Sequence, residues 1–100
     1  MTVKWKRIDD LFAVCLYRAG KNCLNLNCKE ICDILGIKPT SMLMRIENVK
    51  YIATNGEKGL SNYAKQTKEQ WSVYRIMPKK ELITLCNESL DNMLNENNDR

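Results

Sequence analysis

The residues with the most reactive side chains in this sequence are its five cysteines, three of which follow the spacing Cys23-x4-Cys28-x3-Cys32. Zinc sites usually place ligand pairs two to four residues apart and need four ligands, often with histidine among them. This sequence contains no histidine. Cys28 and Cys32, four residues apart, fall on one helical face, where buried thiols are common. An odd number of cysteines without a secretory signal also argues against a disulfide framework. We therefore expect buried structural cysteines, with no metal and no cofactor.

The lack of histidine also bears on catalysis. Histidine is the usual general base and the usual partner that orients a serine or cysteine nucleophile. Carboxylate or lysine chemistry would remain, but no pair of carboxylates stands out in an apolar setting. We expect a protein that is not an enzyme and has no catalytic residues.

A binding motif is easier to identify, in the segment from Ile31 to Ile46. Its first half is typical of a helix that ends at Gly36, because glycine adopts a left-handed conformation without steric cost. Ile37 then fits as an apolar plug between two helices, and Pro39 suits the first turn of the second helix. The segment predicts a helix-turn-helix, a unit that presents the N-terminal side chains of its second helix to the major groove.

The motif suggests which side chains would contact DNA. Hydroxyl and basic groups can reach phosphates or base edges. The candidates are Lys38, Thr40, Ser41, Met44, Arg45 and Lys50, assisted by Lys4, Lys6 and Arg7 of a basic arm over residues 1–7. The arm also carries Trp5, which would either follow the DNA backbone or pack the arm onto the helices. We expect Asn48 to bond backbone groups at the end of the helix rather than to read adenine.

Leu43 and Met44 complicate this interpretation, because DNA-reading helices usually carry polar side chains there. They would contact thymine methyl groups, pack against the following segment, or face a protein partner. A helix-turn-helix also serves as a packing or interaction module.

The rest of the chain predicts one mainly α domain over residues 1–100, a small bundle of about five helices. Periodic apolar residues place the first helix over Ile8 to Ala19, ending at Gly20. A capping box of Asn27 and Glu30 opens the second helix, and the third covers about Pro39 to Val49. Residues 50–58 are expected to form a loop or a short β wing.

Two further helices complete the expected bundle. Thr67 and Gln70 resemble a capping box that opens a helix ending near Arg75. The last helix is expected over residues 78–96, with Pro78 in its first turn and a frayed tail over residues 97–100. Its inner stripe would be Leu82, Leu85, Cys86, Ser89 and Met93.

Charge is unevenly distributed along the chain. Residues 1–80 carry 15 Lys and Arg against 7 Asp and Glu, a net +8, whereas residues 81–100 carry 1 against 5, a net −4. The basic excess favours a polyanion such as nucleic acid, although a solubilising surface gives the same count. No apolar run approaches the roughly 20 residues that span a bilayer, and no apolar stretch follows the basic N-terminus as in a signal peptide. We expect a cytoplasmic protein without a membrane partner.

A longer resemblance covers over half of the chain. The shared features are Leu16-Tyr17, Ile34-Leu35-Gly36, Pro39, the run Ser41-Met42-Leu43-Met44-Arg45-Ile46-Glu47-Asn48, Gly59-Leu60-Ser61 and Trp71. With these, the sequence resembles the helical domain that precedes the nuclease module in bacterial HNH endonucleases and related restriction proteins. In that family the domain is taken to help engage DNA beside a separate catalytic module. Without histidine the nuclease motif cannot exist here, so the resemblance implies the recognition part alone. The sequence departs from the family at Val49, where an aromatic residue is usual, and at residues 51–54, which replace a Leu-Asp-Pro turn.

Two functional hypotheses follow. The first is a non-catalytic helix-turn-helix protein that binds duplex DNA and is regulatory or accessory to a nuclease or restriction system. The second is a small protein-binding module, such as a phage-encoded inhibitor or adaptor, that acts on a nuclease or defence complex through Leu43, Met44 or the acidic C-terminal helix. The stripe of that last helix would face either the bundle or a second copy, as in a homodimer.

Overall fold

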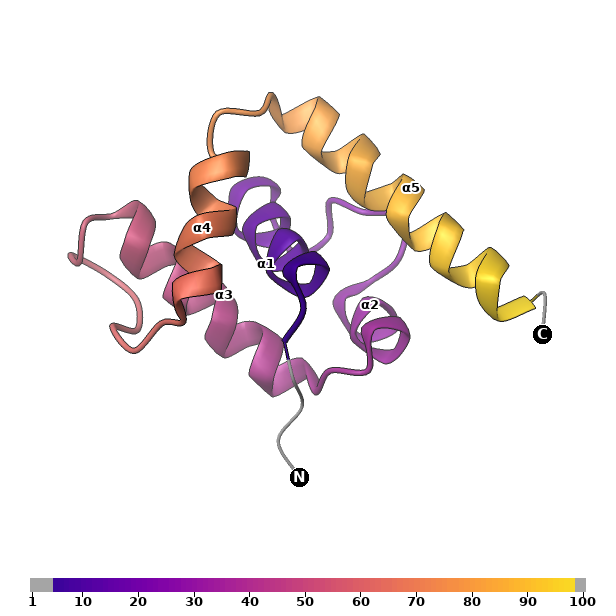
Figure 1. Cartoon of the computed structure of the whole chain (residues 1–100), viewed down its shortest axis with the longest axis horizontal. Helices are drawn as coiled ribbons and strands as arrows, with labels where there is room; N and C mark the ends of the chain where they lie inside the picture. Colours follow the sequence, from indigo (N-terminus) through magenta and orange to yellow (C-terminus); the bar gives the residue numbers. More distant parts are fainter. Residues whose placement is uncertain (1–4, 99–100) are drawn as a thin grey trace.

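The computed structural model describes residues 5–98 and folds them into helices joined by loops of different lengths (Figure 1). The helices are α1 (Arg7–Ala19), α2 (Cys28–Leu35), α3 (Pro39–Ala53), α4 (Lys65–Tyr74) and α5 (Lys79–Asn98). The mainly α class and the five helices expected from the sequence are confirmed. The β wing considered for residues 50–58 is wrong, because residues 5–98 contain no strand and this stretch holds the end of α3 followed by turns.

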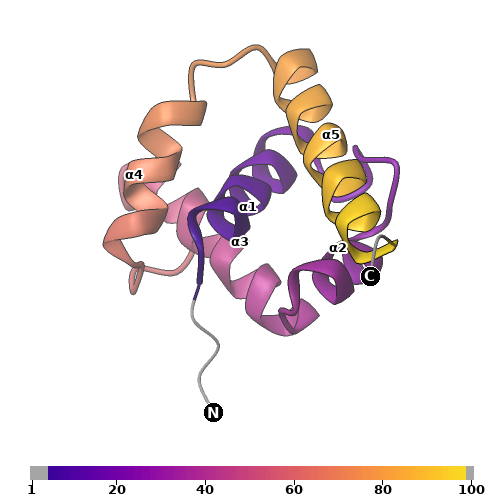
Figure 2. The same ribbon diagram turned by 45° about the vertical axis from the view of Figure 1, so that its right-hand side comes forward.

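Helix α1 lies at the centre of the bundle, packed against α3, α4 and α5 (Figure 2). Six consecutive residues of α1, Leu11 to Leu16, are buried. The sequence pattern predicted one apolar face for this helix, but consecutive buried positions cover the whole circumference of a helix. Burial on all sides makes α1 the core around which the other helices are arranged.

The starts and ends of α1 and α2 follow from local sequence signals. The Lys6 backbone N–H donates to Asp9 Oδ2 at 2.7 Å and so caps α1, and α1 ends before Gly20, whose φ is +97°. At the start of α2, the Glu30 backbone N–H donates to Asn27 Oδ1 at 2.8 Å. The Asn27 backbone N–H donates in return to Glu30 Oε1 at 3.2 Å, which confirms the capping box.

The connection from α2 to α3 is residues 36–38. Gly36 is left-handed with a φ of +74°, and Ile37 is buried. Met42, Ile46 and Val49 of α3 are buried as expected. The local features that predicted a tight turn between two packed helices are therefore present.

Helix α3 continues one turn beyond the predicted end at Val49, to Ala53. The Thr54 backbone N–H and the Thr54 hydroxyl both donate to the Lys50 carbonyl, at 3.0 and 2.8 Å. These bonds satisfy a carbonyl of the last turn, which would otherwise have no partner within the helix.

The predicted start of α4 was wrong. The helix begins at Lys65 after Ala64, so Thr67 lies within its first turn and is buried, rather than capping the helix. Its hydroxyl is used for a long-range bond described below.

Helix α5 is longer than the predicted 78–96 and runs to Asn98, so residues 97 and 98 belong to the helix rather than to a frayed tail. Pro78 stands just before it, and its carbonyl accepts from the Leu82 backbone N–H at 3.0 Å. Of the predicted inner stripe, Leu82 and Cys86 are buried, whereas Leu85, Ser89 and Met93 are half-buried. Leu90 is also buried and was not predicted. None of the helices described over residues 5–98 is long and apolar enough to cross a membrane.

Candidate functional site

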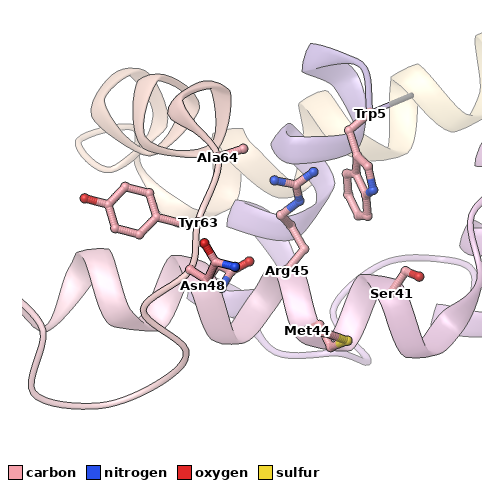
Figure 3. A pocket seen from close by; sticks show the side chains of 8 residues that line it. Trp5, Ser41, Met44, Arg45, Asn48, Tyr63 and Ala64 are labelled. Atoms are coloured by element: carbon pink, nitrogen blue, oxygen red, sulfur yellow. The ribbon is translucent and has the colours of Figure 1, made fainter. Parts of the chain in front are cut away.

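An open hollow of about 440 Å³ lies beside the N-terminal half of α3. It is bounded by three parts of the chain, namely the N-terminal arm, α3, and the segment that leads into α4 (Figure 3). The lining residues are Trp5, Ser41, Met44, Arg45, Asn48, Asn62, Tyr63 and Ala64. Three of the predicted DNA contacts, Ser41, Met44 and Arg45, therefore lie together in one surface feature.

Arg45 is held by internal partners. Its Nη1 donates to Thr67 Oγ1 at 2.6 Å, and its Nε lies 3.4 Å from Asp10 Oδ1. The guanidinium carbon lies 4.0 Å from the centre of a Trp5 ring, a cation–π arrangement visible in Figure 3. Only 12% of the Arg45 side chain is exposed. The predicted DNA contact by Arg45 stays a prediction, but its Nη1 and Nε already have partners within the protein, which limits how its side chain could move toward a ligand.

Asp10 is the centre of this polar cluster and is fully buried. Its Oδ1 accepts from Thr67 Oγ1 at 2.9 Å, and its Oδ2 accepts from Gln66 Nε2 at 2.7 Å. Gln66 Nε2 also donates to the Trp5 carbonyl at 3.2 Å. The cluster of Trp5, Asp10, Arg45, Gln66 and Thr67, called the arm clamp below, thus joins the N-terminal arm, α1, α3 and α4.

Asp9 and Asp10 are two adjacent buried carboxylates, a feature that the sequence did not single out. Burial raises the pKa of Asp9 above its usual range, opposed by the backbone hydrogen bond from Lys6. Neither carboxylate lines the hollow, and each is bonded to protein groups. Hydrogen bonds to groups of the protein therefore explain how both carboxylates are buried, without any role in binding a substrate.

The other predicted contacts on α3 lie at its ends. Lys38 precedes Pro39 at the start of the helix, and both Lys38 and Thr40 are exposed. Lys50 is near the other end, with its Nζ 4.0 Å from Glu47 Oε2. Lys38 and Thr40 therefore share the N-terminal end of α3 with Ser41, whereas Lys50 lies about two and a half turns beyond Ser41.

The basic arm is divided. Trp5 faces the hollow, and Lys6 beside it is exposed. Arg7 instead lines a different hollow between α1 and α4, together with Leu11 and Val73. Lys4 lies outside the described residues. Of residues 5–7, Trp5 lines the hollow beside α3, whereas Lys6 and Arg7 do not.

The apolar side chains that complicated the DNA interpretation are at the surface. Leu43 is 39% exposed and Met44 is 60% exposed. Leu60 is also exposed, and its backbone N–H donates to the Glu47 carbonyl of α3 at 3.1 Å. Packing against the segment after α3, one of the three alternatives raised for Leu43 and Met44, does not bury them, because much of each side chain is exposed.

Sequence reasoning missed the far wall of the hollow, residues 62–64. That wall depends on a close approach of the preceding loop to α3. Asn48 Nδ2 donates to the Leu60 carbonyl at 2.9 Å, so its expected backbone bond is confirmed, although the partner lies in the loop. Gly59 has a φ of +92°, and a Cβ there would meet the Glu47 carbonyl oxygen and lie 2.7 Å from the Tyr51 nitrogen. In the sequence, Asn48 and Gly59 are the residues that could indicate this close approach, but neither residue type identifies the segment that it contacts.

The expectation that the cysteines are buried is confirmed for three of the five. Cys15, Cys32 and Cys86 are buried, while Cys23 and Cys28 are half-buried. Burial raises the pKa of the Cys23 thiol to about 11 and that of Cys32 to about 12. Within residues 5–98, no group of three or more potential ligands is arranged to hold a metal ion.

Comparisons with known proteins add no assignment. No protein-family model matches this sequence, and no curated protein or solved structure matches it. The resemblance to the helical domain of HNH endonucleases remains a prediction from the residues that carry it.

Proposed function

We propose that this domain binds DNA through the N-terminal half of α3 and the neighbouring arm, using α2 and α3 as a helix-turn-helix. The observation that carries the proposal is the arm clamp. Trp5 stacks on Arg45 of α3, and its carbonyl accepts from Gln66 of α4. These contacts fix the arm beside α3, and the exposed Lys6, next to Trp5 in the sequence, would add a positive charge close to the start of the arm clamp.

The side chains of the arm and of the start of α3 suit a phosphate backbone. Lys6, Lys38 and Thr40 are exposed, and Ser41 is half-buried at the edge of the hollow. Lysine and hydroxyl groups are common phosphate contacts, and the N-terminus of a helix favours a negative charge. Arg45 acts in this proposal mainly by positioning Trp5, while Met44 offers an apolar contact to a base.

A binding role fits the chemistry of the rest of the chain. The structure offers internal partners for its buried carboxylates, and the net +8 of residues 1–80 favours a polyanion. We propose a non-catalytic protein that is regulatory or accessory to a nuclease or restriction system, a context that rests on the sequence resemblance alone.

The test is a salt titration of DNA binding, followed by fluorescence anisotropy of a labelled duplex. Lys6→Ala and Lys38→Ala are each expected to weaken DNA binding. Each is also expected to reduce the magnitude of the slope of log affinity against log salt by about 1, because a complex with one phosphate contact fewer releases fewer counterions when it forms. Lys80→Ala is the matched control, since Lys80 is exposed on α5, which packs against α1 and α2. Unchanged binding in both test variants, or equal weakening in the control, would contradict the proposal.

A second candidate function rests on Leu43 and Met44, two consecutive apolar residues of α3 that are both exposed. An exposed apolar cluster is typical of a surface that docks a protein partner. Capture of a partner that survives nuclease treatment and high salt, and that is lost in Leu43→Ser, would select this function. Retention of the same partner by Leu43→Ser would reject this surface as the docking site.

A further inference from the structure

We infer that the hollow beside α3 receives one unstacked DNA base, so that the preferred ligand is DNA with a locally unpaired base rather than a fully paired duplex. This inference rests on the proposed function and specifies its substrate class.

The walls of the hollow combine the two kinds of group that a single base needs. Trp5 provides an aromatic surface and Met44 an apolar thioether, both suited to the flat face of a base. Ser41, Asn48 and Asn62 place a hydroxyl and two amides around the same space. Amides and hydroxyls recognise the polar edges of bases, and unstacked bases are typically held by aromatic stacking together with such edge contacts.

The main wall is preorganised. Trp5 is held through its ring by Arg45 and through its carbonyl by Gln66, and Arg45 is itself fixed by Asp10 and Thr67. The orientation of the Asn48 amide is set by its bond to the Leu60 carbonyl. Because these side chains are already ordered, a ligand loses little affinity to ordering them.

Two exposed lysines are next in the sequence to residues of the hollow. Lys6 follows Trp5 and Lys65 follows Ala64, although neither lysine lines the hollow itself. A nucleotide whose base occupies the hollow would carry its phosphates past these lysines. The arrangement resembles single-strand sites in general, which combine a stacking surface with a basic path for the backbone.

The shape of the hollow favours an unpaired base over a paired one. Base edges in a duplex are read by elements that project into a groove, whereas a hollow of about 440 Å³ accepts a group that projects from the ligand. That volume lies within the ~300–1,000 Å³ typical of sites for small ligands. A base enters such a space only after leaving the stack, which is least costly where it is unpaired.

The experiment compares three ligands of related sequence, namely a fully paired duplex, the same duplex with a one-base bulge, and the single strand. The protein carries Trp71→Phe, so that Trp5 is its only tryptophan and reports on the hollow. We expect the bulged duplex to bind more tightly than the paired duplex and to quench Trp5 fluorescence. Asn62→Ala is expected to reduce the preference for the bulge by about three- to tenfold, as for the loss of one hydrogen bond.

Asn92→Ala on α5 is the control, because Asn92 is exposed as Asn62 is and does not line the hollow. Equal affinity for paired and bulged duplexes, with unchanged Trp5 emission, would overturn the inference and leave the proposed DNA binding intact. Binding to none of the three ligands at low salt would overturn both. The bulged duplex could also bind more tightly than the paired duplex, with this preference unchanged in Asn62→Ala and Met44→Ala. That result would place the base outside the hollow and reject the site.

Discussion

Replacing Asp10 by alanine is expected to destabilise the domain more than any substitution at its surface. Asp10 is fully buried and accepts from Thr67 and Gln66, with Arg45 3.4 Å away. Its removal leaves the Arg45 guanidinium without its carboxylate partner in a site where only 12% of that side chain is exposed.

The expected loss is about 3–5 kcal/mol in the free energy of unfolding, which is typical when one partner of a buried ion pair is removed. Domains of this size unfold with about 5–15 kcal/mol in total, so the variant would lie near the limit of folding. Since each kcal/mol lowers the Tm by roughly 4–8 °C, the midpoint should fall by at least about 12 °C.

The assay is chemical and thermal unfolding followed by circular dichroism, with Asp33→Ala as the matched control. Asp33 is exposed on α2, so its loss should change stability by no more than about 0.5 kcal/mol. The decisive comparison repeats Asp10→Ala in an Arg45→Met background, where no guanidinium remains to be compensated. There the cost of Asp10→Ala should fall by more than about 1 kcal/mol.

Two results would refute this reasoning. A loss of less than about 1 kcal/mol in the free energy of unfolding in the native background would show that the Arg45 guanidinium does not need a carboxylate partner. An equal loss in both backgrounds would show that Asp10 and Arg45 act independently, so that the arm clamp is not a coupled unit.

Three other predictions follow from single positions. Gly59→Ala should cost clearly more stability than Gly20→Ala, measured by urea unfolding; both have a φ above +90°, but a Cβ at Gly20 has nothing within 4 Å, whereas at Gly59 it meets the backbone of α3. Equal losses would contradict the close approach of the loop. Burial raises the pKa of Asp9, so its contribution to stability is present at low pH and is lost as the pH rises through the folded-state pKa. Asp9→Asn keeps an acceptor for the helix cap, so its free energy of unfolding should rise relative to that of the native protein as the pH is raised from about 4 to about 7. A constant difference in the free energy of unfolding across that range would contradict a raised pKa for Asp9. Finally, with a pKa of about 11 in place of 9.0, the Cys23 thiol should be alkylated about a hundredfold more slowly in the folded than in the unfolded protein near neutral pH, as followed by mass spectrometry; equal rates would show that the thiol is not shielded.

Local signals in the sequence were sufficient to predict most helix boundaries. Gly20 and Gly36 stop helices where their backbone conformations require glycine, and the Asn27–Glu30 capping box starts α2. Each of these signals acts within a few residues along the chain, so it can be recognised without knowledge of the tertiary structure.

The candidate site was only partly predictable, because its contacts join distant residues. Asp10 and Thr67 are 57 positions apart, and nothing in the sequence near either one identifies the other. The sequence around Thr67 therefore predicts a helix cap, the usual local role of threonine, and the sequence around Arg45 indicates a DNA contact without revealing its bond to Thr67. The places of Ser41 and Met44 in the N-terminal half of α3 could be predicted, because they follow from the helix alone, but the hollow that they line could not.

The arm clamp also affects the order in which the chain can assemble as it leaves the ribosome. Synthesis delivers the N-terminal residues first, but Trp5 and Asp10 have partners in Gln66 and Thr67 of α4. Until α4 emerges, the nascent chain holds an aromatic arm and a charged pair whose hydrogen bonds are incomplete. Trp5 and Asp10 are thus synthesised well before their partners, and the surface beside α3 is completed only after Gln66 and Thr67 have left the ribosome.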